Sequence, residues 1–254
     1  MEQNNGYRRI CNIQYGADIN NIGDIYIPGC IGRGIVCLFH GGFWKIPYDK
    51  AQFNNVAEKL AKIGFVVWNI EYRRLGYPGA GYPGTFNDVV GAINYLEEII
   101  RKYELNKQQI IIAGHSAGGQ LTLWLGANTE MLNVEPKMVI GLAPVVDLEK
   151  CYESSDRNNF VYDLLKCSPT ENNELYKIVS PIRLISNSIK QAIVYSEKDD
   201  VLPVVEIEEY IKRVRDLNGE IEIAKIEKGG HMDFLDANSE SIGEFIRIVE
   251  ENCA

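Results

Sequence analysis

Residues 109–119 read Gln-Ile-Ile-Ile-Ala-Gly-His-Ser-Ala-Gly-Gly, an apolar run that ends in a glycine-rich turn. The run is typical of a fully buried strand, and the small residues after it favour a helix. Between them, residues 114–118 match the pattern G-x-S-x-G. Glycine on both sides of Ser116 permits a sharp strand-to-helix turn that exposes the serine hydroxyl. This stretch predicts that Ser116 is a nucleophile; a glycine-rich turn without a catalytic role is the alternative.

Similar apolar runs alternate with stretches of helical period along the rest of the chain. Strands are predicted at 34–39, 65–70, 138–142, 192–195 and 220–224, and helices at about 49–62, 204–217 and 239–250. Short buried strands separated by helices indicate a mostly parallel sheet with crossover helices on both faces. At 254 residues, we expect a single α/β domain over residues 1–254.

Other segments carry local signals. Gly64 supplies a stop for the helix at 49–62. Residues 85–88, Thr-Phe-Asn-Asp, fit a capping box, and apolar residues then recur at helical spacing as far as Ile100. We interpret Asp88 as a helix-terminus charge.

Two segments have the composition of excursions from the sheet. Residues 75–84 are too rich in glycine and proline for a regular element and predict a surface loop. Residues 147–188 are polar with weak periodicity, so we expect a small cap of short helices over the carboxyl edge of the sheet. Loops at strand ends often carry function.

The charge and composition exclude several classes of protein. The chain has 26 Lys+Arg and 35 Asp+Glu, a net charge of −9, with no run of Lys or Arg longer than a pair. Proteins that bind nucleic acid or anionic membranes carry basic patches, so neither partner is expected. The 46 % apolar content is that of a folded domain rather than a disordered chain. We therefore expect the binding partner to be a small molecule.

The N-terminal residues have neither the basic nor the apolar region of an export signal, and no stretch reaches the roughly 18 apolar residues of a membrane helix. Six cysteines lack a C-x-x-C pair, and no H-E-x-x-H spacing occurs. We therefore expect a soluble, cytoplasmic protein without a metal or cofactor. The acidic composition suits a monomer and a homodimer equally.

A nucleophilic serine needs a base, most often histidine, and the chain has three. His115 adjoins Ser116 on a sharp turn, so we expect its side chain to point elsewhere and pack beside the turn. His40 precedes the glycine pair at residues 41–42, in a loop that is a candidate for another role, binding the oxyanion. His231, in a glycine turn after the last predicted strand, is the best candidate for the base.

The base needs a carboxylate that orients it. Asp199 and Asp200 follow the strand that ends at Tyr195, and a solvated turn explains whichever of the two is not used. Asp199 comes first and is preferred, with Asp200 in reserve. The order Ser116, Asp199, His231 is the chain order of α/β-hydrolases.

Acyl transfer also needs donors for the oxyanion, which backbone amides commonly supply. Residues 40–44, His-Gly-Gly-Phe-Trp, end an earlier strand with two residues that lack side chains. We expect the oxyanion hole to consist of the amides of Gly41, Gly42, Phe43 and Ala117. A simple turn is the alternative.

With these motifs, the chain from Tyr15 onward resembles the α/β-hydrolase superfamily, and within it the esterase/lipase-like group that includes bacterial kynurenine formamidases. Residues 40–44 look like its H-G-G-x-W loop and residues 114–119 like its G-H-S-A-G-G elbow. Residues 71–74 with 83–88 are similar to the segment that such proteins carry after the next strand. Residues 199–203 match D-x-x-x-P around the family acid, which supports Asp199, and His231 falls where the family base lies.

Together, the residues and the resemblance predict a serine hydrolase that cleaves a small acyl ester or activated amide through Ser116, Asp199 and His231. The aromatic residues Trp44, Tyr77 and Tyr82 lie on loops near the expected mouth and favour a flat substrate such as N-formylkynurenine, although packing explains them as well. A general short-chain carboxylesterase is the first alternative. A non-catalytic binding protein of the same fold is the second.

Overall fold

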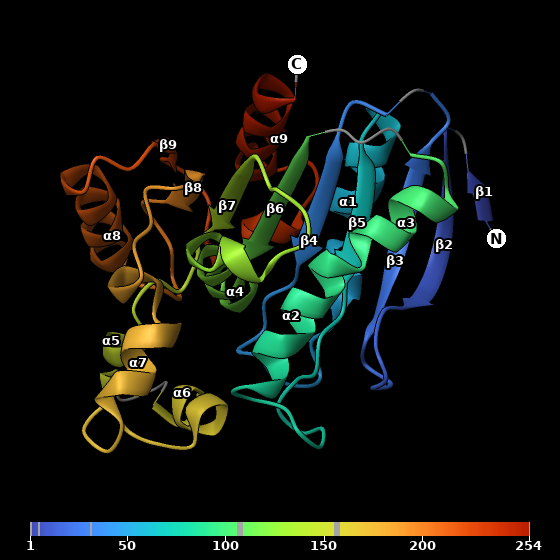
Figure 1. Cartoon of the computed structure of the whole chain (residues 1–254). Helices are drawn as coiled ribbons and strands as arrows, with labels where there is room; N and C mark the ends of the chain where they lie inside the picture. Colours follow the sequence, from blue (N-terminus) through green and yellow to red (C-terminus); the bar gives the residue numbers. More distant parts are fainter. Residues whose placement is uncertain (1, 5, 31, 106–108, 155–157, 254) are drawn as a thin grey trace.

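The computed structural model describes residues 2–4, 6–30, 32–105, 109–154 and 158–253. Within them, nine strands form one sheet in the order β1-β2-β3-β5-β4-β6-β7-β8-β9 (Figure 1). The strands are β1 (Glu2–Asn4), β2 (Tyr7–Gln14), β3 (Ile22–Pro28), β4 (Ile35–Phe39), β5 (Val66–Ile70), β6 (Ile110–His115), β7 (Met138–Leu142), β8 (Lys190–Ser196) and β9 (Ile221–Ile226). Strands β4 to β9 pair in parallel, which confirms the mostly parallel sheet.

Helices cover both faces of this sheet, as predicted. They are α1 (Asn54–Lys62), α2 (Gly84–Asn94), α3 (Leu96–Lys102), α4 (Ala117–Ala127), α5 (Leu148–Glu153), α6 (Asn158–Leu165), α7 (Asn173–Val179), α8 (Val204–Asp216) and α9 (Glu240–Asn252), with 3-10 turns η1 (Lys50–Phe53), η2 (Thr129–Met131), η3 (Pro181–Arg183) and η4 (His231–Leu235). The buried residues of α1 and α9 belong to one apolar cluster, and those of α2, α3, α4 and α8 belong to another. The sheet separates the two clusters.

Alternation along each strand explains how one sheet supports two cores. Successive side chains of a strand point to opposite faces. In β4, Ile35, Cys37 and Phe39 belong to the cluster under α2 and α4, while Val36 and Leu38 belong to the cluster under α1 and α9. All five are buried, which is why the sequence shows a continuous apolar run rather than an alternating one.

The antiparallel strands β1, β2 and β3 were not predicted. Strand β3 pairs antiparallel with β5 and carries Asp24, a fully buried carboxylate that interrupts the apolar pattern. Arg9 Nη2 and Lys50 Nζ lie 2.7 and 2.9 Å from its two oxygens. Burial alone raises the pKa of Asp24, but these cations and the Asn12 amide outweigh it and lower the pKa. An ion cluster thus replaces apolar packing at this position.

The capping box at residues 85–88 is wrong. Helix α2 begins at Gly84 after Pro83, and Thr85 Oγ1 instead accepts from the Gly81 amide and donates to the Arg73 carbonyl. Asp88 is buried and bound to Arg73, so it is an ion-pair residue rather than a helix-terminus charge. The apolar periodicity to Ile100 is also divided, because α2 ends at Asn94 and α3 starts at Leu96.

The segment 147–188 contains short helices, as expected from its weak periodicity. Helix α5 begins at Leu148, capped by Asp147, and α6 and α7 follow it (Figure 1). The turn η3 comes after α7. Tyr82 N donates to the Leu164 carbonyl at 2.8 Å, which ties α6 to the glycine-rich loop at 75–84. The role of this segment as a cap stays a prediction.

Candidate active site

The predicted site residues gather at one edge of the sheet. Phe39, His115, Ser196 and Ile226 are the last residues of β4, β6, β8 and β9. These strands are parallel, so their carboxyl ends share one edge, where open α/β sheets bind ligands. Residues 40–44, Ser116, residues 199–200 and His231 follow these ends directly.

Ser116 occupies a strained turn between β6 and α4. Its φ is 53° and its ψ −115°, a conformation that costs a non-glycine residue about 1–3 kcal/mol. The Ser116 amide donates to the Leu142 carbonyl at 2.9 Å, and the Ser116 carbonyl accepts from the Gln120 amide at 3.0 Å. These bonds hold the turn, so the predicted strand-turn-helix arrangement is present.

The two flanking glycines are explained by close backbone approach. A Cβ on Gly118 would lie 2.1 Å from the Phe39 carbonyl oxygen, and a Cβ on Gly114 would lie 2.3 Å from the Gly118 carbonyl oxygen. The first turn of α4 therefore rests on the end of β4. Any larger residue at either position forces the serine turn away from residues 40–44.

His231 and Asp199 form a buried pair. His231 Nδ1 lies 2.8 Å from Asp199 Oδ2, and because a carboxylate only accepts, the imidazole donates. The other oxygen, Oδ1, accepts from the amides of Val201 and Leu202 at 2.8 and 2.7 Å. Burial raises the pKa of Asp199, but the His231 bond and these two amides outweigh it, so the pKa is lowered and the group is anionic.

Asp200, the second candidate for the orienting carboxylate, binds the backbone of His231 rather than its ring. Its Oδ1 accepts from the backbone amide of His231 at 3.0 Å, and this bond lowers the pKa of Asp200. Asp199 therefore contacts the ring of His231 and Asp200 contacts its backbone. The adjacent acidic residues are both used.

His115 connects Ser116 with His231. Its ring is 2 % exposed, its centroid lies 4.6 Å from that of His231, and its Nε2 lies 3.0 Å from the His231 carbonyl oxygen. Among the described residues, the hydrogen bonds do not include one from Ser116 Oγ to His231. Catalytic hydrogen bonds are often long in proteins without substrate, and a serine hydroxyl rotates freely.

Two of the predicted oxyanion residues, Gly41 and Ala117, lie directly against Ser116. A Cβ on Gly41 would be 3.2 Å from Ser116 Cβ, and Ala117 is the first residue of α4. Gly42 has φ 101°, and a Cβ there would lie 2.3 Å from Tyr48 Cβ, so the backbone requires glycine. Phe43 also has a positive φ, of 56°. Donation by these amides to an oxyanion stays a prediction.

A buried polar cluster supports this loop and was not anticipated as such. His40 Nδ1 lies 2.7 Å from the Gly41 carbonyl oxygen and His40 Nε2 lies 2.8 Å from Glu71 Oε1, so both ring nitrogens face acceptors. The Tyr72 ring stacks on His40 at 4.4 Å, and its hydroxyl donates to the His40 carbonyl. Because C=O and N–H of one trans peptide point in opposite directions, fixing the Gly41 carbonyl also fixes the direction of the Gly42 amide.

Glu71 is the centre of that cluster. Arg74 Nε lies 3.2 Å from Oε1, and the Lys50 amide donates to Oε2 at 3.1 Å. Burial raises the pKa of Glu71, but His40, Arg74 and the Lys50 amide outweigh it and lower the pKa. Glu-Tyr-Arg-Arg at the end of β5 was the available signal, because a carboxylate there follows a fully buried strand.

The predicted substrate-pocket residues differ in exposure. Trp44 is only 1 % exposed and donates from Nε1 to Gln120 Oε1 at 3.1 Å, so its ring packs in the core. Tyr77 and Tyr82 are 38 % and 37 % exposed on the loop at 75–84. The ring of Phe43 lies 4.6 Å from that of Phe160 in α6. Whether these rings contact substrate stays a prediction.

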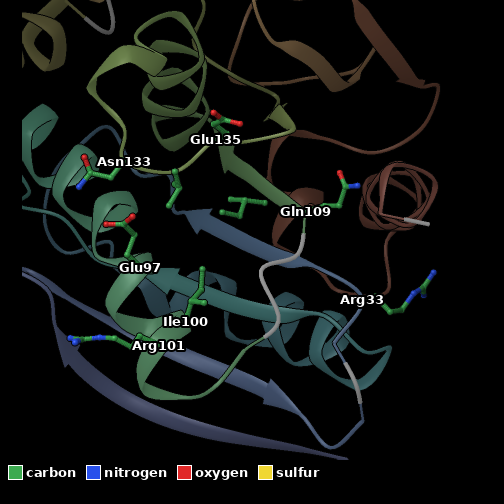
Figure 2. Close-up of a pocket in the computed structure, with 9 residues that line it drawn as sticks. Arg33, Glu97, Ile100, Arg101, Gln109, Asn133 and Glu135 are labelled. Atoms are coloured by element: carbon green, nitrogen blue, oxygen red, sulfur yellow. The ribbon is translucent and has the colours of Figure 1, made fainter.

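A cavity of about 820 Å³ lies elsewhere, beside Gln109 and Glu135 (Figure 2). Gln109 immediately precedes β6, and Arg33 and Glu135 precede β4 and β7. The cavity is therefore at the amino ends of the parallel strands, opposite Ser116. Arg33 is already paired with Glu250, and Arg101 with Glu98.

Among the described residues, no group of three His, Cys, Asp or Glu side chains is arranged to hold a metal ion. Likewise, no helix in the described ranges has the length and apolar character needed to cross a membrane.

Comparison with known proteins relates this geometry to a family. Residues 24–212, from β3 to within α8, match the protein family described as BD-FAE. The chain belongs to the BD-FAE family. The matched segment of the BD-FAE domain includes residues 40–44, Ser116, Asp199 and Asp200, whereas His231 lies beyond it.

The BD-FAE chain is also similar to named esterases. It is 26 % identical to esterase LipC of Mycobacterium tuberculosis (strain ATCC 25618 / H37Rv) over 219 residues, 80 % of this chain and 54 % of that protein. It is 37 % identical to neutral cholesterol ester hydrolase 1 of Bos taurus over 101 residues, 37 % of this chain and 23 % of that protein. The chain thus spans about half or less of these curated relatives.

Solved structures of low identity share the fold. Esterase B from Lactobacillus rhamnosis superposes with a TM-score of 0.82 at 16 % identity, covering 99 % of this chain and 88 % of that one. A truncated carbohydrate esterase from gut microbiota gives 0.84 at 19 % identity, covering 98 % and 97 %. The predicted α/β-hydrolase fold of the esterase/lipase-like group is confirmed.

Proposed function

We propose that this chain is a serine carboxylesterase that cleaves small acyl esters. The observation that carries the proposal is the buried pair of His231 and Asp199, 2.8 Å apart, at the same strand edge as the strained turn of Ser116. A nucleophile, a base and an orienting carboxylate are the parts that acyl transfer requires. Membership of the BD-FAE family and similarity to esterase LipC support the hydrolase class.

The reaction proceeds through an acyl-enzyme. Ser116 Oγ attacks the acyl carbonyl carbon while His231 Nε2 accepts the hydroxyl proton, and the amides of Gly42, Phe43 and Ala117, with Gly41, donate to the oxyanion. His231 then gives its proton to the departing alkoxide. Water, deprotonated by the same imidazole, releases the acid and restores Ser116. Asp199 keeps His231 protonated on Nδ1, which leaves Nε2 as the acceptor.

Ser116→Ala tests the mechanism directly. We expect hydrolysis of p-nitrophenyl acetate to fall to the uncatalysed background, while the melting temperature and circular dichroism spectrum stay those of the wild type. Retained turnover in the folded variant contradicts the mechanism. Labelling with a fluorophosphonate probe separates an enzyme from a binding protein of this fold, because only an activated Ser116 reacts.

The acyl group and leaving group are separated by a substrate panel. It contains p-nitrophenyl acetate, p-nitrophenyl butyrate, an acetylated sugar and N-formylkynurenine. The sugar is included because one structural neighbour is a carbohydrate esterase. The arylformamidase hypothesis rests on the H-G-G-x-W pattern at residues 40–44, whereas the named relatives are esterases. We expect higher kcat/KM for the esters; a higher value for N-formylkynurenine reverses this choice.

A further inference from the structure

His115 touches three parts of the candidate site at once, although the mechanism above gives it no role. It ends β6 directly before Ser116, its ring packs against His231 with centroids 4.6 Å apart, and it faces Gly41 on its other side. Phe234 stacks on the ring at 5.8 Å and 22°. A side chain in contact with the nucleophile turn, the oxyanion loop and the base is well placed to fix their relative positions.

The hydrogen bond of His115 defines its protonation. Nε2 lies 3.0 Å from the His231 carbonyl oxygen, and a carbonyl only accepts, so Nε2 carries the proton and donates. Burial, followed by the neighbouring His231, lowers the pKa of His115 to about 3. The ring is therefore neutral in the range where esterases are assayed, with its proton on Nε2 and a lone pair on Nδ1.

The lone pair of Nδ1 has no hydrogen-bond partner among the described residues, although the atom is buried. A Cβ on Gly41 would lie 2.9 Å from it, so the Gly41 backbone rests directly on this side of the ring. An unsatisfied buried polar atom costs free energy. An apolar residue here would avoid that cost, and the feature that an apolar residue cannot reproduce is the Nε2 donor.

That donor completes the restraint of His231. The amide of His231 is held by Asp200 at 3.0 Å, its ring by Asp199 at 2.8 Å, and its carbonyl by His115 at 3.0 Å. The glycine pair Gly229-Gly230 before it offers little stiffness of its own, and Gly229 has φ 105°. Without the third bond, the carbonyl of His231 loses its side-chain donor on the side that faces the Ser116 turn.

The geometry points to His115 as a positioning residue of the hydrolysis reaction: by donating from Nε2 to the His231 carbonyl, it sets the distance between the His231 ring and Ser116. This inference rests on the proposed function. His115 exchanges no proton with the substrate. Its contribution lies in the placement of the base, so its loss lowers kcat while substrate binding is retained.

Two variants of similar size separate the donor from the packing. His115→Gln keeps an N–H donor at about the position of Nε2, whereas His115→Met fills the site without one. With p-nitrophenyl acetate, we expect His115→Met to lower kcat by about ten- to a hundred-fold, the factor for one lost buried hydrogen bond, with KM changed less than about threefold. His115→Gln is expected to recover most of kcat.

Tyr210→Phe is the matched control for stability. It removes a buried hydrogen bond of 2.6 Å from Tyr210 in α8 to Gln191 in β8, away from Ser116, so its melting temperature falls while its kcat does not. Rates are normalised to the fraction of protein that a fluorophosphonate labels. Equal kcat for the Met and Gln variants, or a kcat loss in Tyr210→Phe of the same size, overturns the positioning role. If the wild type neither labels nor turns over, the proposed function itself fails.

Discussion

The ion pair of Asp88 and Arg73 provides a quantitative test of the fold. Asp88 Oδ2 accepts from the backbone N and Nε of Arg73 at 2.9 and 2.8 Å, and Oδ1 accepts from Nη2 at 2.7 Å. The Asp88 side chain is 4 % exposed and that of Arg73 is 21 % exposed. Removing one partner of a buried pair costs about 3–5 kcal/mol, because the remaining charge stays desolvated.

We expect Asp88→Ala to lower the free energy of unfolding by about 3 kcal/mol, the lower end of that range, because Arg73 reaches some solvent. With an unfolding entropy of roughly 2.1 cal/mol/K per residue over 254 residues, this corresponds to about a 6 °C lower melting temperature. Urea titration followed by circular dichroism measures the first quantity, and calorimetry the second.

The control is Glu174→Ala, which breaks an exposed pair with Lys177 on α7. We expect a change below about 0.5 kcal/mol there, as for other surface pairs. Asp88→Asn keeps the shape and one acceptor oxygen, so its loss should fall between the two. If the free energy of unfolding of Asp88→Ala lies within about 1 kcal/mol of the wild-type value, with a similar urea midpoint, the buried ion pair is contradicted and Asp88 is a helix-terminus charge.

Two further predictions concern the supports of the active-site loops. Because the pKa of Glu71 lies below its ordinary value of 4.5, its stabilisation is complete above pH 4.5 and is lost as the pH falls through the lower folded value. Glu71→Gln should therefore be less stable than the wild type at pH 7 and lose less stability between pH 5 and pH 3, in urea titrations at each pH; a parallel loss in both proteins contradicts this. Gly118→Ala sets a Cβ 2.1 Å from the Phe39 carbonyl oxygen, so it should abolish soluble expression or lower the free energy of unfolding by more than about 4 kcal/mol. The control is Gly243→Ala on α9, where a Cβ would have no neighbour within 4 Å, and it should be neutral or stabilising. Thermal denaturation of the purified variants decides, and an unperturbed Gly118→Ala protein would refute the close approach of α4 to β4.

The parallel half of the sheet was predictable because its strands are buried on both faces. Residues 110–113 are apolar without interruption, and burial on both faces requires that composition. The antiparallel strand β3 was missed because Asp24 breaks the pattern. Its partners Arg9 and Lys50 come from β2 and η1, and sequence spacing does not reveal a long-range ion pair.

The capping box failed for a related reason. The spacing of Thr85 and Asp88 fits a local motif, but both side chains bind Arg73, which lies on the other side of the glycine-rich loop. Local rules assign a polar side chain to its neighbours in sequence. At residues 85–88 the tertiary partner supplies more hydrogen bonds than the helix terminus does, so the tertiary arrangement wins.

The hydrogen bonds of the three histidines, which the sequence does not reveal, distinguish the candidate base from the other two. Both nitrogens of His40 face acceptors within 2.8 Å, the Gly41 carbonyl and Glu71, so the ring is engaged on both sides and neither nitrogen is free to act on Ser116. His115 donates from Nε2, and its Nδ1 lone pair faces the Gly41 backbone. His231 donates from Nδ1 to Asp199, which leaves an unused lone pair on Nε2, the tautomer that a general base for a serine requires. Elimination by position and elimination by hydrogen bonding are independent, and both favour His231.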